Sequence, residues 1–160
     1  MSATITTVRP AQQKDVPAIV ALVTKTLAEF GIPFGEESPT DEQLLGLPSA
    51  YTAQGGAFFV AEIDGTIVGT AGIIPIGVAA DGIHELRKMY LDPAARGRGV
   101  GQRLLSASLT HARDNGARRI VLDTAERMTA AIAFYEKNGF VRDDAYITYP
   151  RCSRGYRLDL

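Results

Sequence analysis

Residues 85–105 read ELRKMYLDPAARGRGVGQRLL, and this stretch carries the strongest structural signal in the chain. Its first part, 85–91, is rich in apolar residues, as is typical of a buried strand, and three glycines then fall within the five positions 97–101. Glycines let the backbone turn tightly and approach a ligand closely. The helical pattern that follows aims unpaired N–H groups at whatever the loop holds. The stretch therefore predicts a site for an anion, most naturally a phosphate.

Two common phosphate-binding loops fit this stretch poorly. A Walker loop needs Lys followed by Ser or Thr after its last glycine, whereas Gln102 and Arg103 follow Gly101 here. The dinucleotide fingerprint would need its third glycine at position 102, and it normally follows the first strand of a domain. Nucleoside triphosphate hydrolysis is therefore disfavoured, and dinucleotide binding fits little better.

A second motif lies downstream in a recognisable order. The Asp92-Pro93 turn and the glycine loop are followed by a helical pattern, a strand at 120–124 and then, at 130–140, the segment AAIAFYEKNGF. This order, which covers about residues 57–145, resembles the GNAT superfamily of acyl-CoA N-acyltransferases. The resemblance implies that the glycine loop holds the pyrophosphate of coenzyme A and that the Tyr-Glu-Lys segment lies beside the thioester sulfur.

The resemblance also implies a set of cofactor contacts. Main-chain amides of a splayed central strand would face the acetyl group and pantetheine, and the loop would contact the phosphates. The implied cofactor-binding residues are Met89, Tyr90, Leu91, Arg96, Gly97, Arg98, Gly99, Val100, Gly101 and Gln102. As single surface side chains, the two arginines could equally be solvated. Many relatives carry an asparagine where this chain has Met128, which leaves the contact at that position open.

Acyl transfer to an amine needs a proton acceptor for the amine and a proton donor for the departing thiolate, besides N–H donors for the oxyanion. The resemblance assigns these two roles to Glu85, acting through water, and to Tyr135. The alternative for Glu85 is a strand glutamate that faces solvent or pairs with Arg87 or Lys88, with water alone as the acceptor. The alternative for Tyr135 is a core tyrosine that packs with its aromatic neighbours.

Composition sets the class of protein. The chain has 160 residues, 46% hydrophobic and 22% charged, which suits one domain over residues 1–160 with a full core. A formal net charge of −1 predicts neither a nucleic acid nor an anionic membrane as partner. The start of the chain lacks a signal-peptide pattern, so a cytoplasmic location is expected. The single cysteine, Cys152, and two histidines offer no internal disulfide and no plausible metal site, and Cys152 is expected to be an inert thiol.

The hydrophobic patterns predict a mixed α/β (α+β) fold whose mostly antiparallel sheet is flanked by helices, and the resemblance adds a splayed central strand. Asp64-Gly65 is well suited to a hairpin turn. Strands are expected over 5–9, 57–63, 67–74, 83–91, 119–123 and, from 140 onwards, together with 155–160. Helices are expected over 11–30, 41–47, 101–114 and 129–137.

The resemblance places the acceptor site among the first two helices, their loop and the C-terminal strands. These regions contain aromatic and acidic residues that could hold an apolar body carrying a cationic amine, or could be core and solvated positions: Phe30, Phe34, Glu36, Glu37, Tyr51, Tyr146 and Tyr149. The sequence predicts an N-acetyltransferase that moves an acetyl group from acetyl-CoA directly to the amine of a small molecule in a ternary complex, with a homodimer possible. The alternatives are a protein or peptide N-acetyltransferase and a non-catalytic acyl-CoA-binding module.

Overall fold

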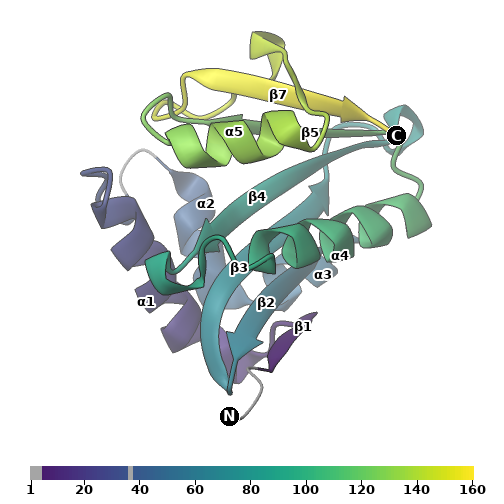
Figure 1. Cartoon of the computed structure of the whole chain (residues 1–160). Coiled ribbons are helices and arrows are strands. Elements are labelled where there is room, and N and C mark those ends of the chain that lie inside the picture. The colour runs from purple at the N-terminus through teal and green to yellow at the C-terminus, as the bar shows by residue number, and fades with distance from the viewer. Residues whose placement is uncertain (1–4, 36–37) are drawn as a thin grey trace.

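The computed structural model describes residues 5–35 and 38–160 and is built on a seven-stranded sheet (Figure 1). The strand order is β1-β2-β3-β4-β5-β7-β6, and every neighbouring pair is antiparallel except β4 and β5. This is the mixed, mostly antiparallel sheet expected from the sequence. The strands are β1 (Thr6–Pro10), β2 (Ala57–Ile63), β3 (Thr66–Pro75), β4 (Ile83–Leu91), β5 (Arg119–Thr124), β6 (Val141–Arg142) and β7 (Arg154–Asp159).

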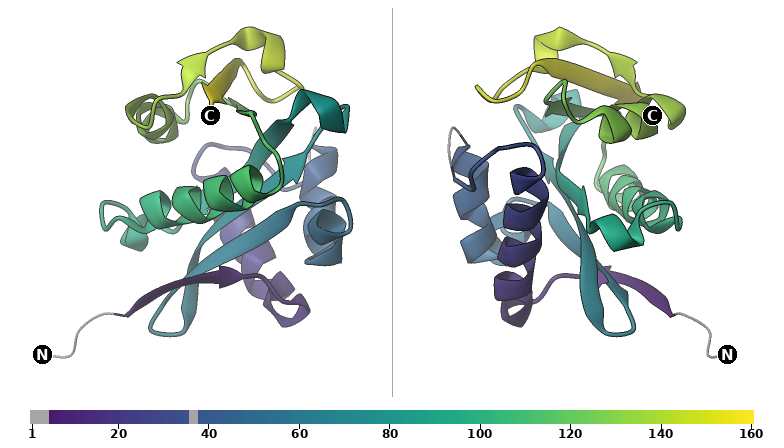
Figure 2. Two further views of the ribbon diagram at one scale, coloured as in Figure 1. Left: turned by 90° about the vertical axis from the view of Figure 1, so that its right-hand side faces the viewer. Right: turned by 60° about the vertical axis from the view of Figure 1, so that its left-hand side comes forward.

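Helices cover both faces of the sheet, with α1, α2 and α3 on one side and α4 and α5 on the other (Figure 2). Their bounds are α1 (Val16–Ala28), α2 (Pro39–Glu42), α3 (Ser49–Thr52), α4 (Val100–Asp114) and α5 (Thr129–Lys137). Short 3-10 turns lie at η1 (Gln13–Asp15), η2 (Gln43–Gly46), η3 (Ala79–Asp81), η4 (Pro93–Ala95) and η5 (Asp144–Tyr146). A membrane crossing would need a longer and more apolar helix than any in the described ranges.

Two expected helices differ from those observed. The expectation of a helix from residue 11 is wrong at its start, because the backbone N–H of Gln12 donates to Asp15 Oδ2 (2.8 Å) and Pro17 favours the first turn of a helix that begins at residue 16. The short helix expected over 41–47 begins earlier, at Pro39, and gives way to a 3-10 turn after Glu42.

Each face of the sheet has its own hydrophobic core. Under α1, Ile19, Val23 and Leu27 recur every four residues and are fully buried, so one stripe of the helix packs against the sheet. On the opposite face, Leu104 and Leu105 of α4 belong to a buried cluster that continues into α5. The sheet is therefore held from both sides along β4, the strand that carries the candidate site.

Two irregularities in β4 shape that site. The pairing with β3 shifts between Thr70 and Gly72, so that Lys88 and Met89 both face a single partner position and form a β-bulge. Lys88 has φ +54 within this bulge. On its other edge β4 pairs with β5 only from Ile83 to Glu85, and the two strands then diverge. The splayed central strand expected from the resemblance is confirmed.

Candidate active site

A cavity of about 330 Å³ opens where β4 and β5 diverge. It is lined by β4 from Glu85 onwards, by the glycine loop, by the end of β5, by α5 and by the C-terminal loop over 149–152. Its volume is at the lower end of the range typical of small-ligand sites, about 300–1,000 Å³. Eight of the twelve catalytic and cofactor-binding residues proposed from the sequence line it: Glu85, Met89, Tyr90, Leu91, Arg96, Gly97, Gly101 and Tyr135. The other four, Arg98, Gly99, Val100 and Gln102, lie in the adjoining loop and first turn of α4.

The glycine loop presents free N–H groups. Gly97 and Gly99 have φ +73 and +77, a left-handed conformation that favours glycine, and Gly99 caps α4. The first helical bond runs from Arg103 N–H to the Gly99 carbonyl (3.2 Å), and no acceptor for the N–H groups of 97–102 occurs among the described residues. These amides and the positive end of the α4 dipole together make an anion site.

The two arginines of the loop differ. The Arg96 guanidinium donates to both carboxylate oxygens of Glu29 (2.9 Å each) and to the Leu91 carbonyl (3.0 Å). Its charged end is thus held against the end of α1, although its side chain lines the cavity. Arg98 is exposed and forms no ion pair with any residue in the described ranges. Of the two, Arg98 is the one available to a phosphate.

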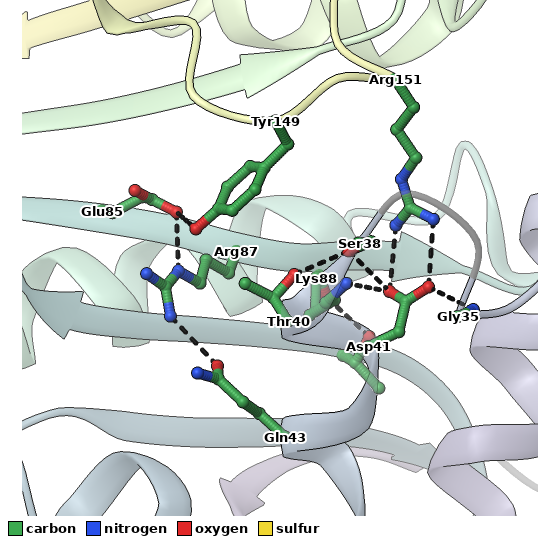
Figure 3. A network of polar contacts seen from close by, with 11 residues as sticks. Gly35, Ser38, Thr40, Asp41, Gln43, Glu85, Arg87, Lys88, Tyr149 and Arg151 are labelled. Atoms are coloured by element: carbon green, nitrogen blue, oxygen red, sulfur yellow. Dashed lines mark hydrogen bonds and ion pairs between the residues drawn. The ribbon is translucent and has the colours of Figure 1, made fainter.

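Glu85 lines the cavity and is 5% exposed. Its Oε1 accepts hydrogen bonds from Arg87 Nε (2.6 Å) and from the Tyr149 hydroxyl (3.1 Å), as Figure 3 shows. Burial, and then the nearby Glu85 carboxylate, raise the pKa of Tyr149, which keeps its hydroxyl a donor. Within the described part of the chain Oε2 has no hydrogen-bond partner. The pairing with Arg87 was one alternative from the sequence; the contact with Tyr149 was not foreseen.

Tyr135 is both packed in the aromatic core and part of the cavity wall. Its ring packs edge-on against Phe134 and Phe140, with centroids 5.9 and 5.7 Å away. The residue is 7% exposed and lines the cavity, and its hydroxyl has no hydrogen-bond partner in the described structure. Burial raises the pKa of Tyr135, and neighbouring Tyr90 and Cys152 add to the shift. The phenol is therefore protonated and available as a donor inside the cavity.

A second polar group lies beside Glu85, formed by Lys88 of β4, Asp41 of α2 and Arg151 of the C-terminal loop (Figure 3). We call it the Lys88–Asp41–Arg151 cluster. Arg151 donates through Nη1 and Nη2 to the two carboxylate oxygens of Asp41 (3.0 and 2.9 Å), and Lys88 Nζ also donates to this carboxylate. Burial alone would raise the pKa of Asp41, but Arg151 and Lys88 hold it below its usual value. Sequence reasoning missed this cluster, because its members are far apart in the chain.

Cys152 and Met128 also belong to the cavity wall. Burial and nearby Asp123 raise the pKa of Cys152 to about 12, so the thiolate is disfavoured. Met128 lines the cavity, and its sulfur accepts a hydrogen bond from Thr124 (3.6 Å). A thioether thus stands at the position where many relatives carry an asparagine.

The residues considered for an acceptor site lie in different parts of the structure. Phe30 and Tyr149 line the cavity, whereas Tyr51 is fully buried in the core beneath α1. Phe34 packs against that same core, and Tyr146 accepts a hydrogen bond from Arg119 (2.8 Å). Glu36 and Glu37 lie outside the described residues.

Comparison with known proteins agrees with this geometry. Residues 20–140 match the family model described as "Acetyltransferase (GNAT) family". The uncharacterized N-acetyltransferase YjgM of Escherichia coli is 36% identical over 82% of this chain and 79% of its own length. A mycothiol acetyltransferase of Cellulomonas flavigena is 31% identical over 58% of this chain, which spans only 28% of that protein.

Among solved structures, one similar chain is yncA of Salmonella typhimurium, described as a putative acetyltransferase with its cofactor acetyl-CoA. The superposition has a TM-score of 0.76 and covers 96% of this chain and 93% of that one, at 21% sequence identity. At this identity the similarity shows a shared fold.

Proposed function

We propose that this chain, which belongs to the acetyltransferase (GNAT) family, moves the acetyl group of acetyl-CoA directly to the amine of a small molecule within a ternary complex. Membership of the family makes it an acetyl-CoA-dependent N-acetyltransferase. The observation that carries the finer proposal is the shared cavity. It brings the glycine loop, the unpaired edge of β4, the Glu85 carboxylate and the Tyr135 hydroxyl to one place.

The loop and β4 fit coenzyme A. The free N–H groups of 97–102 would hold the pyrophosphate, with Arg98 close by as a cation. A Cβ at Gly101 would lie 3.3 Å from a Leu91 methyl and 3.6 Å from the Phe134 ring, so the chain is closely packed where the cavity meets α4. When bound, acetyl-CoA supplies the thioester carbonyl, and main-chain amides at Met89, Tyr90 and Leu91 would face it along the edge that β5 leaves free.

Glu85 is proposed as the base. Arg87 and Tyr149 both bind Oε1 and so fix the orientation of the carboxylate, which leaves Oε2 to take the proton from the amine, directly or through one water. The ion pair therefore positions Glu85 for this role. Tyr149 and Arg87 act through Glu85 and are positioning residues.

Tyr135 is proposed as the acid. Its packed ring fixes the direction of the hydroxyl, and that hydroxyl is not engaged by any described residue. Because its raised pKa keeps the phenol protonated, it can donate to the sulfur as negative charge develops there. The proton that Glu85 removes and the one that Tyr135 gives are then exchanged with solvent between turnovers.

A small acceptor is favoured by the modest cavity volume of about 330 Å³ and by the mycothiol acetyltransferase among the relatives. The test is a screen of small amines and of peptides with free N-termini, read as free thiol released from acetyl-CoA. We expect turnover with small amines, and peptides as the better class of acceptor would refute the small-molecule assignment. Acetyl-CoA labelled in its acetyl group should leave no label on the protein when amine is absent; stoichiometric labelling would refute direct transfer.

A further inference from the structure

The bulge in β4 gathers cations on one face of the sheet. In a regular strand Lys88 would point away from Glu85 and Arg87, because neighbouring side chains alternate between faces. The extra residue at the bulge and φ +54 at Lys88 instead direct its ammonium to Asp41 of α2. Arg87 reaches the same side, where its Nη1 donates to Gln43 Oε1 (3.2 Å). Figure 3 shows the two groups side by side.

Cations outnumber carboxylates in this network. Glu85 pairs with Arg87, while the single carboxylate of Asp41 is shared by Lys88 and Arg151. Three positive side chains thus meet two negative ones among the described residues. The surplus charge lies in the Lys88–Asp41–Arg151 cluster, since the other pair is balanced.

A third carboxylate on the cavity wall, that of Asp123 in β5, has different partners. Its Oδ2 accepts the backbone N–H groups of Thr148 (2.7 Å) and Tyr149 (3.0 Å), which ties β5 to the C-terminal loop. No ion pair links Asp123 to a cation in the described ranges. Its charge is stabilised by amides, and it is not the counter-ion of the cluster.

The surplus cation is also short of hydrogen-bond acceptors. The side chains of Lys88 and Arg151 are 4% and 11% exposed. An ammonium has three N–H donors, and Asp41 supplies the one acceptor found for Lys88 in the described structure. Because a buried charge is costly unless it is paired and hydrogen-bonded, an anion in the cavity would be bound strongly here. Both side chains line that cavity.

We propose that the acceptor amine also carries a carboxylate, and that Lys88 and Arg151 bind it. An amino acid has this chemistry, with its amine directed to Glu85 and its carboxylate to the cluster. The inference rests on the proposed function and names its substrate class. The phosphates of coenzyme A are assigned to the glycine loop, so they do not account for the cluster.

The experiment compares three matched sets of acceptors: the proteinogenic L-amino acids, their carboxamides and their decarboxylated amines, with thiol release from acetyl-CoA as the readout. We expect the best amino acid to exceed its own carboxamide about 10- to 100-fold in kcat/KM, the scale of one charge-assisted hydrogen bond. Lys88→Met leaves Asp41 and Arg151 as a balanced pair and should bring this ratio close to one. The KM for acetyl-CoA should not change.

Arg119→Met is the matched control, because that arginine pairs with Asp159 and does not line the cavity. It should keep the wild-type ratio. Arg151→Met leaves Lys88 and Asp41 as the balanced pair, so it provides a second variant if thermal unfolding shows that Lys88→Met does not fold. Calorimetric binding of amino acid and carboxamide to the enzyme with coenzyme A adds a readout that needs no turnover.

Three results would overturn the inference. Carboxamides or decarboxylated amines that react as well as the amino acids would do so while leaving the proposed function intact. An equal loss of kcat/KM for both acceptors in Lys88→Met would instead place Lys88 at the reacting carbonyl. If no small amine reacts although coenzyme A binds, the proposed function fails and this inference fails with it.

Discussion

Gly99→Val tests the glycine loop most directly. Gly99 has φ +77, and a Cβ added there would meet no heavy atom within 4 Å, so the cost of the substitution is conformational rather than steric. A left-handed residue with a side chain costs about 1–2 kcal/mol, and a β-branched one lies at the upper end. In a chain of 160 residues, each ~1 kcal/mol lowers Tm by about 2–4 °C, so we expect a decrease of about 4–8 °C.

The substitution should also weaken the binding of coenzyme A, and by more than the modest decrease in Tm suggests. The strain is relieved by rotation of the backbone, which redirects the N–H groups of 97–102 that have no other partner. Loss of one or two charge-assisted hydrogen bonds corresponds to a roughly 10- to 1,000-fold higher Kd by calorimetry. Gly116→Val is the control, since Gly116 has φ +85, an equally open Cβ position and an exposed place beyond α4. Unchanged affinity in Gly99→Val, or equal losses in both variants, would remove the loop from cofactor binding.

Three further predictions concern single side chains. Tyr135→Phe should keep Tm within a few degrees and lower kcat about 10- to 1,000-fold; a lower Tm with unchanged turnover per folded molecule would make Tyr135 a core residue only. Glu85→Gln should lower kcat without weakening coenzyme A binding, whereas Glu62→Gln, which also loses a carboxylate bound to an arginine, should leave both kcat and coenzyme A binding unchanged. The hydrogen bond from Arg9 holds the pKa of Asp15 below 3.8, so the stability lost in Arg9→Met should be greatest at neutral pH and shrink as the pH falls through that lowered pKa; a loss independent of pH in thermal unfolding would contradict this linkage.

Most helices and strands could be predicted, because their hydrophobic spacing and turn residues lie within the element or next to it in the sequence. Asp64-Gly65 adopts positive φ at both positions and joins β2 to β3, as the turn pair indicated. The helix after the glycine loop begins at Val100, one residue before the expected start. The start of α1 was placed too early: the apolar spacing begins at Val16, and residues 13–15 form a 3-10 turn that the bond from Gln12 to Asp15 closes.

Contacts between distant segments could not be predicted in the same way. The ion pair of Arg96 could not be predicted from its place in the loop, because Glu29, which binds its guanidinium, lies 67 positions earlier. Lys88 looked like any charged residue of a strand. Only the register shift against β3 determines that it points to Asp41, and such a shift depends on tertiary packing rather than on the local sequence.

The alternatives that the sequence left open for Glu85 prove compatible. An ion-paired glutamate and a catalytic one seemed to exclude each other, but a carboxylate has two oxygens. Arg87 and Tyr149 occupy Oε1, and this arrangement fixes where Oε2 lies. Tyr135 has a similar arrangement, because its ring packs against the aromatic core while the residue lines the cavity. If Glu85 and Tyr135 have the proposed roles, one part of each side chain is anchored and another reacts, so loss of the anchor should impair catalysis before it impairs folding. Tyr149 is the residue that connects this arrangement to the C-terminal loop, and the same loop carries Arg151, which also lines the cavity.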